Sequence, residues 1–525
     1  MNLLSITTYN RFTKLLANTG LFNKLGKKNK KQEETAVSLN DIYFNNLREN
    51  TIGANHEMKS VHGKKDIVYL DWTASGRLYK PIEDKLVNVA GPFVANTHTE
   101  SNTTGSFTTK AYHKAQQIIK NHVNASNDDI LINYHSGTTA VINKLQRILG
   151  LRVDEEYLSK LALDSSSKPV VFITHMEHHS NHTSWLETIA DVVIVEPNEK
   201  GEVEPRNLEK LLIQYQDRPL KIGSFSACSN VTGVMTPYHQ MAELMHKHAG
   251  YCFVDFAASA PYVEINMHPE NPMQRLDAIF FSPHKFLGGP ASSGVLIFNS
   301  SLYHKNAPDN PGGGTVSWTN PWGGKKYVDN IEAREDGGTP PFLQVMKTAL
   351  CIKLKEEMLQ NNMQKRKDAM FKQLWNDLKS IDEVVILDED KENRLSIISF
   401  YLDIPDFSYN LVVKMLDERF GIQVRGGCSC AGTYGHYLLN IDQKTSKDIT
   451  NEIDKGILSR KPGWIRVSLH PINTFEEIET FSFAIRQVIA NYNEWKKDYT
   501  YNPSTNEYSS CSFLYKEELE ELFTL

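Results

Sequence analysis

The sequence predicts an α/β fold in which a doubly wound sheet is followed by a smaller domain. Short apolar segments with the length of buried strands begin at Lys168, Lys221 and Tyr251, and each ends in a polar turn. Segments with a helical pattern lie between them, as at 240–248. The chain of 525 residues is long enough for one large and one small domain. We therefore expect ligands at the carboxyl ends of the strands.

Composition excludes several classes of function. The formal net charge is −6 with both signs mixed, so no global positive field points to nucleic acid. No apolar run reaches the length of a membrane span. The six cysteines lack the spacing of a disulfide framework, and only Cys428 and Cys430 form a cluster. This usage fits a reducing compartment, so we expect a cytoplasmic protein that binds neither nucleic acid nor membranes.

The first 37 residues form a basic N-terminal extension. Residues 1–31 contain no Asp or Glu, and their apolar side chains follow a roughly helical pattern. One interpretation is a mitochondrial presequence or a membrane-surface helix. The other is a loose extension without a targeting role, which the predominance of Lys over Arg favours. A mitochondrial location is therefore the alternative to the cytoplasm.

Lys285 lies between two apolar strands, 277–281 and 294–298. Burying an unpaired ammonium is costly, and an imine with an aldehyde cofactor would remove that cost while creating a reactive group. Ser282 and His284 beside the lysine could hold a phosphate. The alternative is a surface turn with a solvated lysine.

Asp255 ends a short hydrophobic strand 30 residues before Lys285, which leaves room for a crossover between neighbouring strands. Pyridoxal 5'-phosphate (PLP) needs such a carboxylate, because an acid beside its pyridinium nitrogen keeps that nitrogen protonated and lets the ring accept electrons. The alternative is an aspartate that caps the following loop. Together the lysine and the aspartate favour a PLP site.

A phosphate cradle is predicted at Gly137, Thr138 and Thr139. The three residues lie between the strand that begins at Ile130 and a helix over 141–149. Backbone amides at the start of a helix, with two hydroxyls beside them, bind an anion without a lysine.

These segments resemble the class V aminotransferase group of PLP enzymes, and within it the cysteine desulfurases and selenocysteine lyases. The resemblance runs in order from about Tyr69 to Thr474. It implies the type I fold of PLP-dependent transferases, with a large domain over 38–345 that contains a seven-stranded, mostly parallel sheet. A smaller C-terminal α+β domain over 346–497 and a tail over 498–525 would follow.

The resemblance also implies roles for single residues. His178 would stack on the PLP ring and relay protons, and Asn230 would hydrogen-bond to its phenolic oxygen. Thr339 would reach the phosphate of the other subunit, which implies a homodimer. The family usually has Gln where this chain has Ala258, so either Ser259 or a water replaces the amide, or the cofactor is tuned differently.

Four histidines in the segment 175–182 invite a metal interpretation, but their spacing differs from that of the inverted zinc-protease motif. We therefore predict no metal ligands here and assign the segment to the cofactor site.

Cys430 is the predicted nucleophile. In the family an Arg precedes the reactive Cys by five positions and an Ala follows it, which matches Arg425, Cys430 and Ala431. Cys428 replaces a common His, and the Gly-Cys-x-Cys form resembles the desulfurase domain of molybdenum cofactor sulfurases. About 30 residues of tail cannot supply the further domain of those proteins. Alternatives are an oxidisable thiol pair or a zinc site with His436.

Arg466 would bind the substrate carboxylate through its planar guanidinium, the alternative being a strand-end arginine with a purely structural role. The sequence thus predicts a PLP-dependent, cysteine desulfurase-like enzyme that takes sulfur or selenium from a small amino acid and passes it to an acceptor protein. The alternatives are another class V lyase, epimerase or aminotransferase that does not use Cys430, and a non-catalytic sulfur-relay scaffold.

Overall fold

The computed structural model describes residues 40–97, 99–135, 137–158, 160, 163–510 and 514–525. The predicted basic extension and its targeting hypothesis lie outside the described residues. The chain divides into two compact units, residues 1–46 and 47–525. In the first unit, residues 40–46 are helical.

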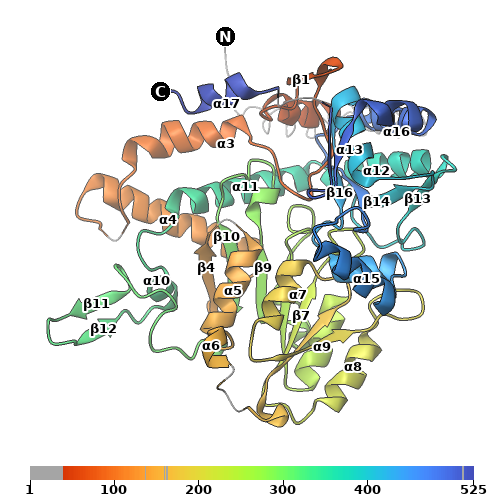
Figure 1. The fold of residues 1–525 in the computed structure, drawn as a ribbon. Coiled ribbons are helices and arrows are strands. Elements are labelled where there is room, and N and C mark those ends of the chain that lie inside the picture. Colours follow the sequence, from red (N-terminus) through yellow and green to blue (C-terminus); the bar gives the residue numbers. More distant parts are fainter. Residues whose placement is uncertain (1–39, 98, 136, 159, 161–162, 511–513) are drawn as a thin grey trace, which may run out of the picture. The chain divides into compact units, whose positions relative to one another are not determined.

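A seven-stranded sheet forms the centre of the second unit (Figure 1). Its order is β4-β10-β9-β8-β7-β5-β6, and only β10 runs antiparallel to its neighbours. The central strands β5, β7 and β9 are buried along their whole length, as expected of parallel strands covered on both faces. The predicted mostly parallel, seven-stranded sheet is confirmed. The strands are β4 (Asp129–Tyr134), β5 (Val170–Thr174), β6 (Asp191–Val195), β7 (Lys221–Ser226), β8 (Tyr251–Asp255), β9 (Ala278–Phe281) and β10 (Gly294–Asn299).

Helices in the crossovers pack on this sheet and bury its apolar side chains. One pair in mutual contact is α5 (Thr138–Ile148) and α7 (His179–Leu186). A second pair is α8 (Pro205–Gln214) and α9 (Tyr238–Lys247). Because successive parallel strands need such crossovers, the carboxyl ends of β4, β5, β7, β8 and β9 meet at one edge of the sheet.

Further elements surround the large sheet. Helix α4 (Thr103–His122) packs along α11 (Phe342–Gln360), and the hairpin of β11 (Val316–Thr319) and β12 (Lys325–Tyr327) projects away from the sheet (Figure 1). The remaining short pieces are α3 (Lys80–Lys85), α6 (Glu155–Leu158), α10 (Ile331–Glu335) and the hairpin of β1 (Glu57–Ser60) and β2 (Gly63–Asp66).

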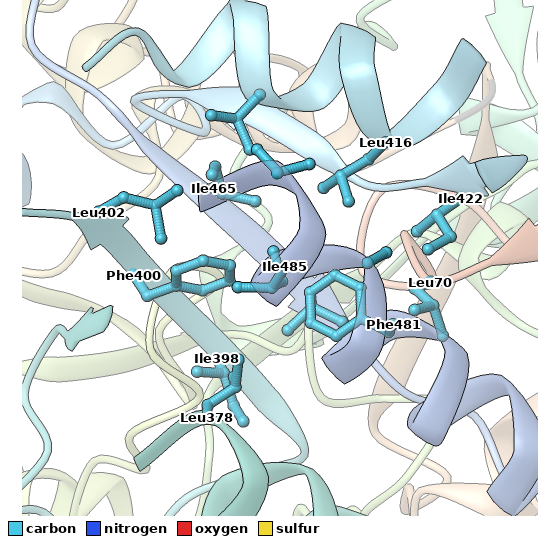
Figure 2. Packing of buried hydrophobic residues seen from close by; sticks show 14 of the residues in the cluster. Leu70, Leu378, Ile398, Phe400, Leu402, Leu416, Ile422, Ile465, Phe481 and Ile485 are labelled. Atoms are coloured by element: carbon cyan, nitrogen blue, oxygen red, sulfur yellow. The ribbon is translucent and has the colours of Figure 1, made fainter. Parts of the chain in front are cut away.

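A second, antiparallel sheet has the order β13-β14-β17-β16. Its strands are β13 (Val384–Ile386), β14 (Ile397–Leu402), β17 (Trp464–Ser468) and β16 (Arg425–Gly427). The helices α12 (Met363–Lys379), α13 (Tyr409–Phe420) and α16 (Phe475–Trp495) pack around it. Figure 2 shows its core, where Phe400, Ile465 and Phe481 are fully buried.

Two residues from the first part of the chain also belong to this second core. Val68 and Leu70 pack in the same cluster, because β3 (Val68–Tyr69) pairs in parallel with β15 (Ile422–Gln423) (Figure 2). The proposed division into 38–345 and 346–497 stays a prediction. After β16 come α14 (Gly432–Leu438) and α15 (Gln443–Ile453), and the tail forms a hairpin of β18 (Thr500–Asn502) and β19 (Glu507–Ser509) and the helix α17 (Lys516–Leu522).

Candidate active site

A cavity of about 540 Å³ lies where the carboxyl ends of the parallel strands meet the second sheet. All but one of the site residues predicted from the sequence line it, although they come from segments spread over more than 300 residues. They are Thr138, Thr139, His178, Asn230, Asp255, Ser282, His284, Lys285, Arg425, Cys430 and Arg466.

Lys285 reaches the cavity from a single 3-10 turn, Pro283–Lys285, that directly follows β9. The chain then turns through Gly288, which has a φ of +79° that favours glycine. Burial lowers the pKa of Lys285 to about 8, and the nearby Asp255 carboxylate opposes this shift. The amine is therefore partly unprotonated near neutral pH. The alternative of a solvated surface lysine is not what the structure shows.

Asp255 ends β8 and is only 5% exposed. Burial raises the pKa of its carboxyl to about 7, the nearby Glu177 adds to this effect, and the Lys285 ammonium counteracts it. The Ala257 amide donates to Asp255 Oδ1 at 2.8 Å, so the carboxylate also caps the following loop. The loop-capping contact is thus present, and the role beside a cofactor ring stays a prediction.

Hydroxyl groups gather at the start of α5. The amide of Thr138 donates to Ser282 Oγ at 2.9 Å, and the two hydroxyls are 2.6 Å apart. Thr139 Oγ1 lies 2.6 Å from Ser180 Oγ. The N-cap residue Gly137 supplies no side-chain cap, and a Cβ there would lie 3.3 Å from Ser282 Oγ. The helix N-terminus is thus open to an anion.

Cys430 follows β16 and has a left-handed backbone with φ of +57°. A side-chain hydrogen bond with His178 is the largest of the effects that lower the thiol's pKa to about 7. Arg425 Nη2 lies 3.9 Å from Cys430 Sγ and adds to this effect. The Ser180 amide donates to His178 Nδ1 at 3.1 Å, so the proton of the neutral ring is on Nε2.

Arg466 lies on β17 with only 2% of its surface exposed. Its Nη2 pairs with Asp71 Oδ1 at 2.6 Å and its Nη1 donates to the Asn230 carbonyl at 3.0 Å, while Nε has no hydrogen-bond partner. Asp71 was not among the predicted site residues. The guanidinium is thus held in place by the protein at the wall of the cavity.

Asn230 connects the cofactor region to the cysteine segment. Its Nδ2 donates to the Ser429 carbonyl at 2.7 Å, and its Oδ1 is buried without a hydrogen-bond partner. Ala258 lines the cavity where the family usually has Gln, and the neighbouring Ser259 hydroxyl is also buried without a partner. The choice between Ser259 and a water as replacement for the amide stays open.

The two metal interpretations find no support in the described residues, where no three His, Cys, Asp or Glu side chains are grouped closely enough to hold a metal ion. Both ring nitrogens of His436 are engaged, Nδ1 with the Gly432 carbonyl and Nε2 with the Ser446 hydroxyl. Cys428 and Cys430 are both free thiols. Of the four clustered histidines, only His178 lines the cavity.

Thr339 is the one predicted site residue that does not line this cavity. It lies exposed in a neighbouring cavity with Asn133, Glu335 and Pro340, and His135 lines both cavities. Its predicted contact with the phosphate of another subunit is not tested by a single chain.

The model of the aminotransferase class V family matches residues 68–481. The chain belongs to this family. Similar class V proteins include a probable cysteine desulfurase of Staphylococcus aureus (strain Mu50 / ATCC 700699), which is 26% identical over 377 residues, covering 71% of this chain and 85% of the relative. A probable cysteine desulfurase of Halalkalibacterium halodurans is 25% identical over 387 residues, covering 72% and 88%.

Solved structures agree on the fold of this class V chain. The apo cysteine desulfurase of Thermococcus onnurineus NA1 has a TM-score of 0.67 at 20% identity, covering 85% of this chain and 98% of the other. The cysteine desulfurase CsdA of Escherichia coli has a TM-score of 0.63 at 20% identity, covering 81% and 94%. The predicted type I fold is therefore confirmed. Within the described part of the chain, every helix is too short or too polar to cross a membrane.

Proposed function

We propose that this class V protein is a PLP-dependent cysteine desulfurase that takes sulfur, or selenium, from a cysteine-like amino acid and holds it on Cys430. One observation carries the proposal. A thiol with a lowered pKa shares a cavity with a buried lysine and a buried aspartate at the carboxyl ends of a parallel sheet. The cysteine desulfurases among its relatives and structural neighbours support the same assignment.

The residues present fit PLP. Lys285 would hold the aldehyde carbon, Asp255 would face the ring nitrogen, and the open N-terminus of α5 would take the phosphate. Asn230 lines the cavity and its buried Oδ1 lacks a partner, which fits a polar group prepared for a ligand. When bound, PLP supplies an electron sink that weakens bonds at the substrate's α-carbon.

Lys285 and His178 are placed to move protons. With a pKa of about 8, Lys285 can hold or release a proton at Nζ near neutral pH. Burial lowers the pKa of His178, so its imidazole is neutral and holds its proton on Nε2, because Nδ1 accepts from the Ser180 amide. The histidine can therefore protonate or stabilise the thiolate according to its state.

Cys430 performs the sulfur transfer. Its thiolate attacks the sulfur of the substrate, the sulfur–sulfur bond forms, and the carbon–sulfur bond breaks. The carbon atom takes up a proton and the product leaves as alanine, so neither an oxidant nor a reductant is consumed. The persulfide on Cys430 then passes to a thiol acceptor, which we propose to be another protein in the cell.

The arginines orient the substrate. Arg466 lines the cavity and is fixed by Asp71, so its guanidinium can pair with the substrate carboxylate without first being ordered. Arg425 lies beside Cys430 Sγ and would stabilise the negative charge of thiolate and persulfide. Both arginines are thus next to the atoms that react.

The test is the release of sulfide and alanine from L-cysteine in the presence of a thiol reductant. Cys430→Ser is expected to abolish both products while the visible absorbance of bound PLP remains. The matched control is Cys428→Ser, which removes the neighbouring thiol and is expected to keep the activity.

Two results would contradict this proposal. Unchanged release in Cys430→Ser would show that Cys430 is not the acceptor. Retained PLP absorbance without sulfide or selenide release from cysteine or selenocysteine in the unaltered protein would redirect the search to lyase or aminotransferase substrates.

A further inference from the structure

Residues Cys428–Thr433 form the segment that carries Cys430. The first turn of α7 holds this segment through hydrogen bonds. Two hydrogen bonds with His179 enclose the reactive residue: the His179 amide donates to the Cys430 carbonyl at 2.8 Å, and the Gly432 amide donates to His179 Nε2 at 3.0 Å. His179 does not line the cavity itself. It therefore contacts the backbone on both sides of the thiol without touching the reacting atoms.

The segment needs such support because its backbone is strained. Ser429 and Cys430 have φ values of +51° and +57°, so two consecutive residues with side chains occupy the left-handed region. Residues other than glycine adopt this conformation only where the surrounding structure holds them there. Without external hydrogen bonds the segment would relax, and the thiol would move.

Other contacts fix the flanks of the segment but not Cys430. Asn230 Nδ2 and Trp464 Nε1 both donate to Ser429, and Thr433 Oγ1 lies 3.0 Å from His182 Nδ1. His179 forms two hydrogen bonds to the backbone of Cys430 and Gly432 from outside the segment. His436 Nδ1 bonds to the Gly432 carbonyl from the helix that follows, and this bond does not reach Cys430.

The same turn supplies the partner of the thiol. His178, the N-cap residue of α7, forms the side-chain hydrogen bond that lowers the pKa of Cys430, and His179 directly follows it. Both histidines belong to one helical turn. The distance between the imidazole of His178 and Cys430 Sγ therefore depends on how His179 anchors the backbone of Cys430. Gly432 completes the fit, since a Cβ there would lie only 3.2 Å from His179 Nε2.

We propose that His179 is a positioning residue, which holds Cys430 in its left-handed conformation and so keeps the thiol against His178 and Arg425 as a reactive thiolate. The inference rests on the proposed function only in that sulfur transfer would use this thiol. The reactivity of the thiol itself can be measured without any amino-acid substrate.

The measurement is the rate at which iodoacetamide alkylates Cys430 between pH 5 and 10, followed by mass spectrometry of the peptide that contains it. The full-length protein is used as purified with PLP, in a Cys428→Ser background so that one thiol of that peptide reacts. The midpoint of the reference protein is expected near pH 7, which is where the thiol's pKa lies.

His179→Leu removes the acceptor for Gly432 and is expected to move the midpoint toward the ordinary cysteine value of about 8.5. The alkylation rate at pH 7 then falls about 15-fold while the rate at pH 10 is unchanged, because only the thiolate reacts. His179→Gln is the conservative variant, since its amide oxygen can reach the Gly432 amide, and it is expected to restore the midpoint near 7. Thr433→Val removes the bond to His182 alone and should leave the midpoint in place.

An unchanged midpoint in His179→Leu, or an equal shift in His179→Gln, would overturn the inference. If thermal unfolding shows that His179→Leu does not fold, Gly432→Ala tests the same contact. An unshifted midpoint in Gly432→Ala would also overturn the inference. A protein that releases no sulfide from cysteine but shows the shift would contradict the proposed function and leave the inference standing.

Discussion

Burial moves the pKa values of Lys285 and Asp255 toward each other, the lysine down to about 8 and the aspartate up to about 7. Each charge also favours the charged form of the other. A pair whose two groups titrate close to neutral pH can take up or release a proton at little cost, which is what acid–base chemistry requires. The apoprotein therefore has its lysine prepared for an aldehyde.

The rate at which the apoprotein attaches PLP should reflect this pKa. Only the unprotonated amine attacks an aldehyde, and the folded pKa is lower than the ordinary 10.5, so the rate should rise with pH and level off above about 8. Stopped-flow absorbance after mixing the apoprotein with PLP measures it. Asp255→Asn removes the charge that raises this pKa and should move the midpoint to lower pH. A midpoint near 10, or an upward shift in the variant, would contradict the expected environment of Lys285.

At the scale of residues, spacing was enough to predict the side chains that follow buried strands. Asp255 ends β8, whereas Lys285 and Thr138 lie four positions after β9 and β4, and parallel strands bring such positions together. Asp71 could not be predicted as the partner of Arg466, because the two are 395 positions apart and pair only through the small sheet. The roles of His179 and Glu177 likewise depend on contacts that no local pattern contains.

At the scale of elements, the C-terminus of α13 attaches the chain near Asp66 to the small core. The helix ends at Gly421 with φ of +73°, and the Gly421 carbonyl accepts a hydrogen bond from the Val68 amide at 3.0 Å. A Cβ on Gly421 would lie 2.1 Å from the Asp66 carbonyl oxygen. The position thus requires glycine for its conformation and for the close approach of a second backbone.

Gly421→Ala should therefore lower the free energy of unfolding by about 3 kcal/mol, of which about 1 kcal/mol comes from the left-handed conformation and the rest from the forced displacement. Gly456→Ala is the matched control, because Gly456 has φ of +76° with nothing within 4 Å of its Cβ position. It should lose only about 1 kcal/mol. Urea unfolding followed by far-UV circular dichroism compares the two, and equal losses would show that the contact with Asp66 is not tight.

The helices and strands themselves were largely predictable, whereas their pairing was not. Apolar periodicity predicted helices over 141–149 and 240–248, which the structure shows as α5 and α9 with boundaries shifted by one to three residues. The short strand β3 has its parallel partner β15 some 350 residues later. Registers of this kind are set by tertiary packing, so a single sequence contains little information about them.

At the scale of the whole molecule, the candidate site takes its residues from both sheets. The large sheet contributes Lys285 and Asp255, and the small sheet contributes Arg425 and Arg466. Cys430 thus follows a strand of a different core from Lys285. Its contacts with α7, which packs on the large sheet, bring Cys430 to the same cavity. Stable packing between the two cores would therefore be a condition for the proposed sulfur transfer.

The last prediction concerns Thr339, which does not line the candidate active site of its own chain. It is exposed and lines the neighbouring cavity. We propose a homodimer in which it donates a hydrogen bond to the phosphate held by the partner subunit. Light scattering should then give about twice the chain mass of 59.7 kDa. Thr339→Val should weaken PLP binding about tenfold, the effect of one hydrogen bond to a charged group.

Mixing two variants distinguishes a contact across the interface from one within the chain. A hybrid of Thr339→Val with Lys285→Ala has one site that combines an intact Lys285 with an intact Thr339 from the other chain. That site should bind PLP with the affinity of the unaltered protein, because the PLP phosphate again accepts a hydrogen bond from the hydroxyl of Thr339. A titration of the hybrid with PLP measures this. If the hybrid keeps the weakened affinity, Thr339 acts on its own chain, and a monomeric mass would reject the shared site altogether.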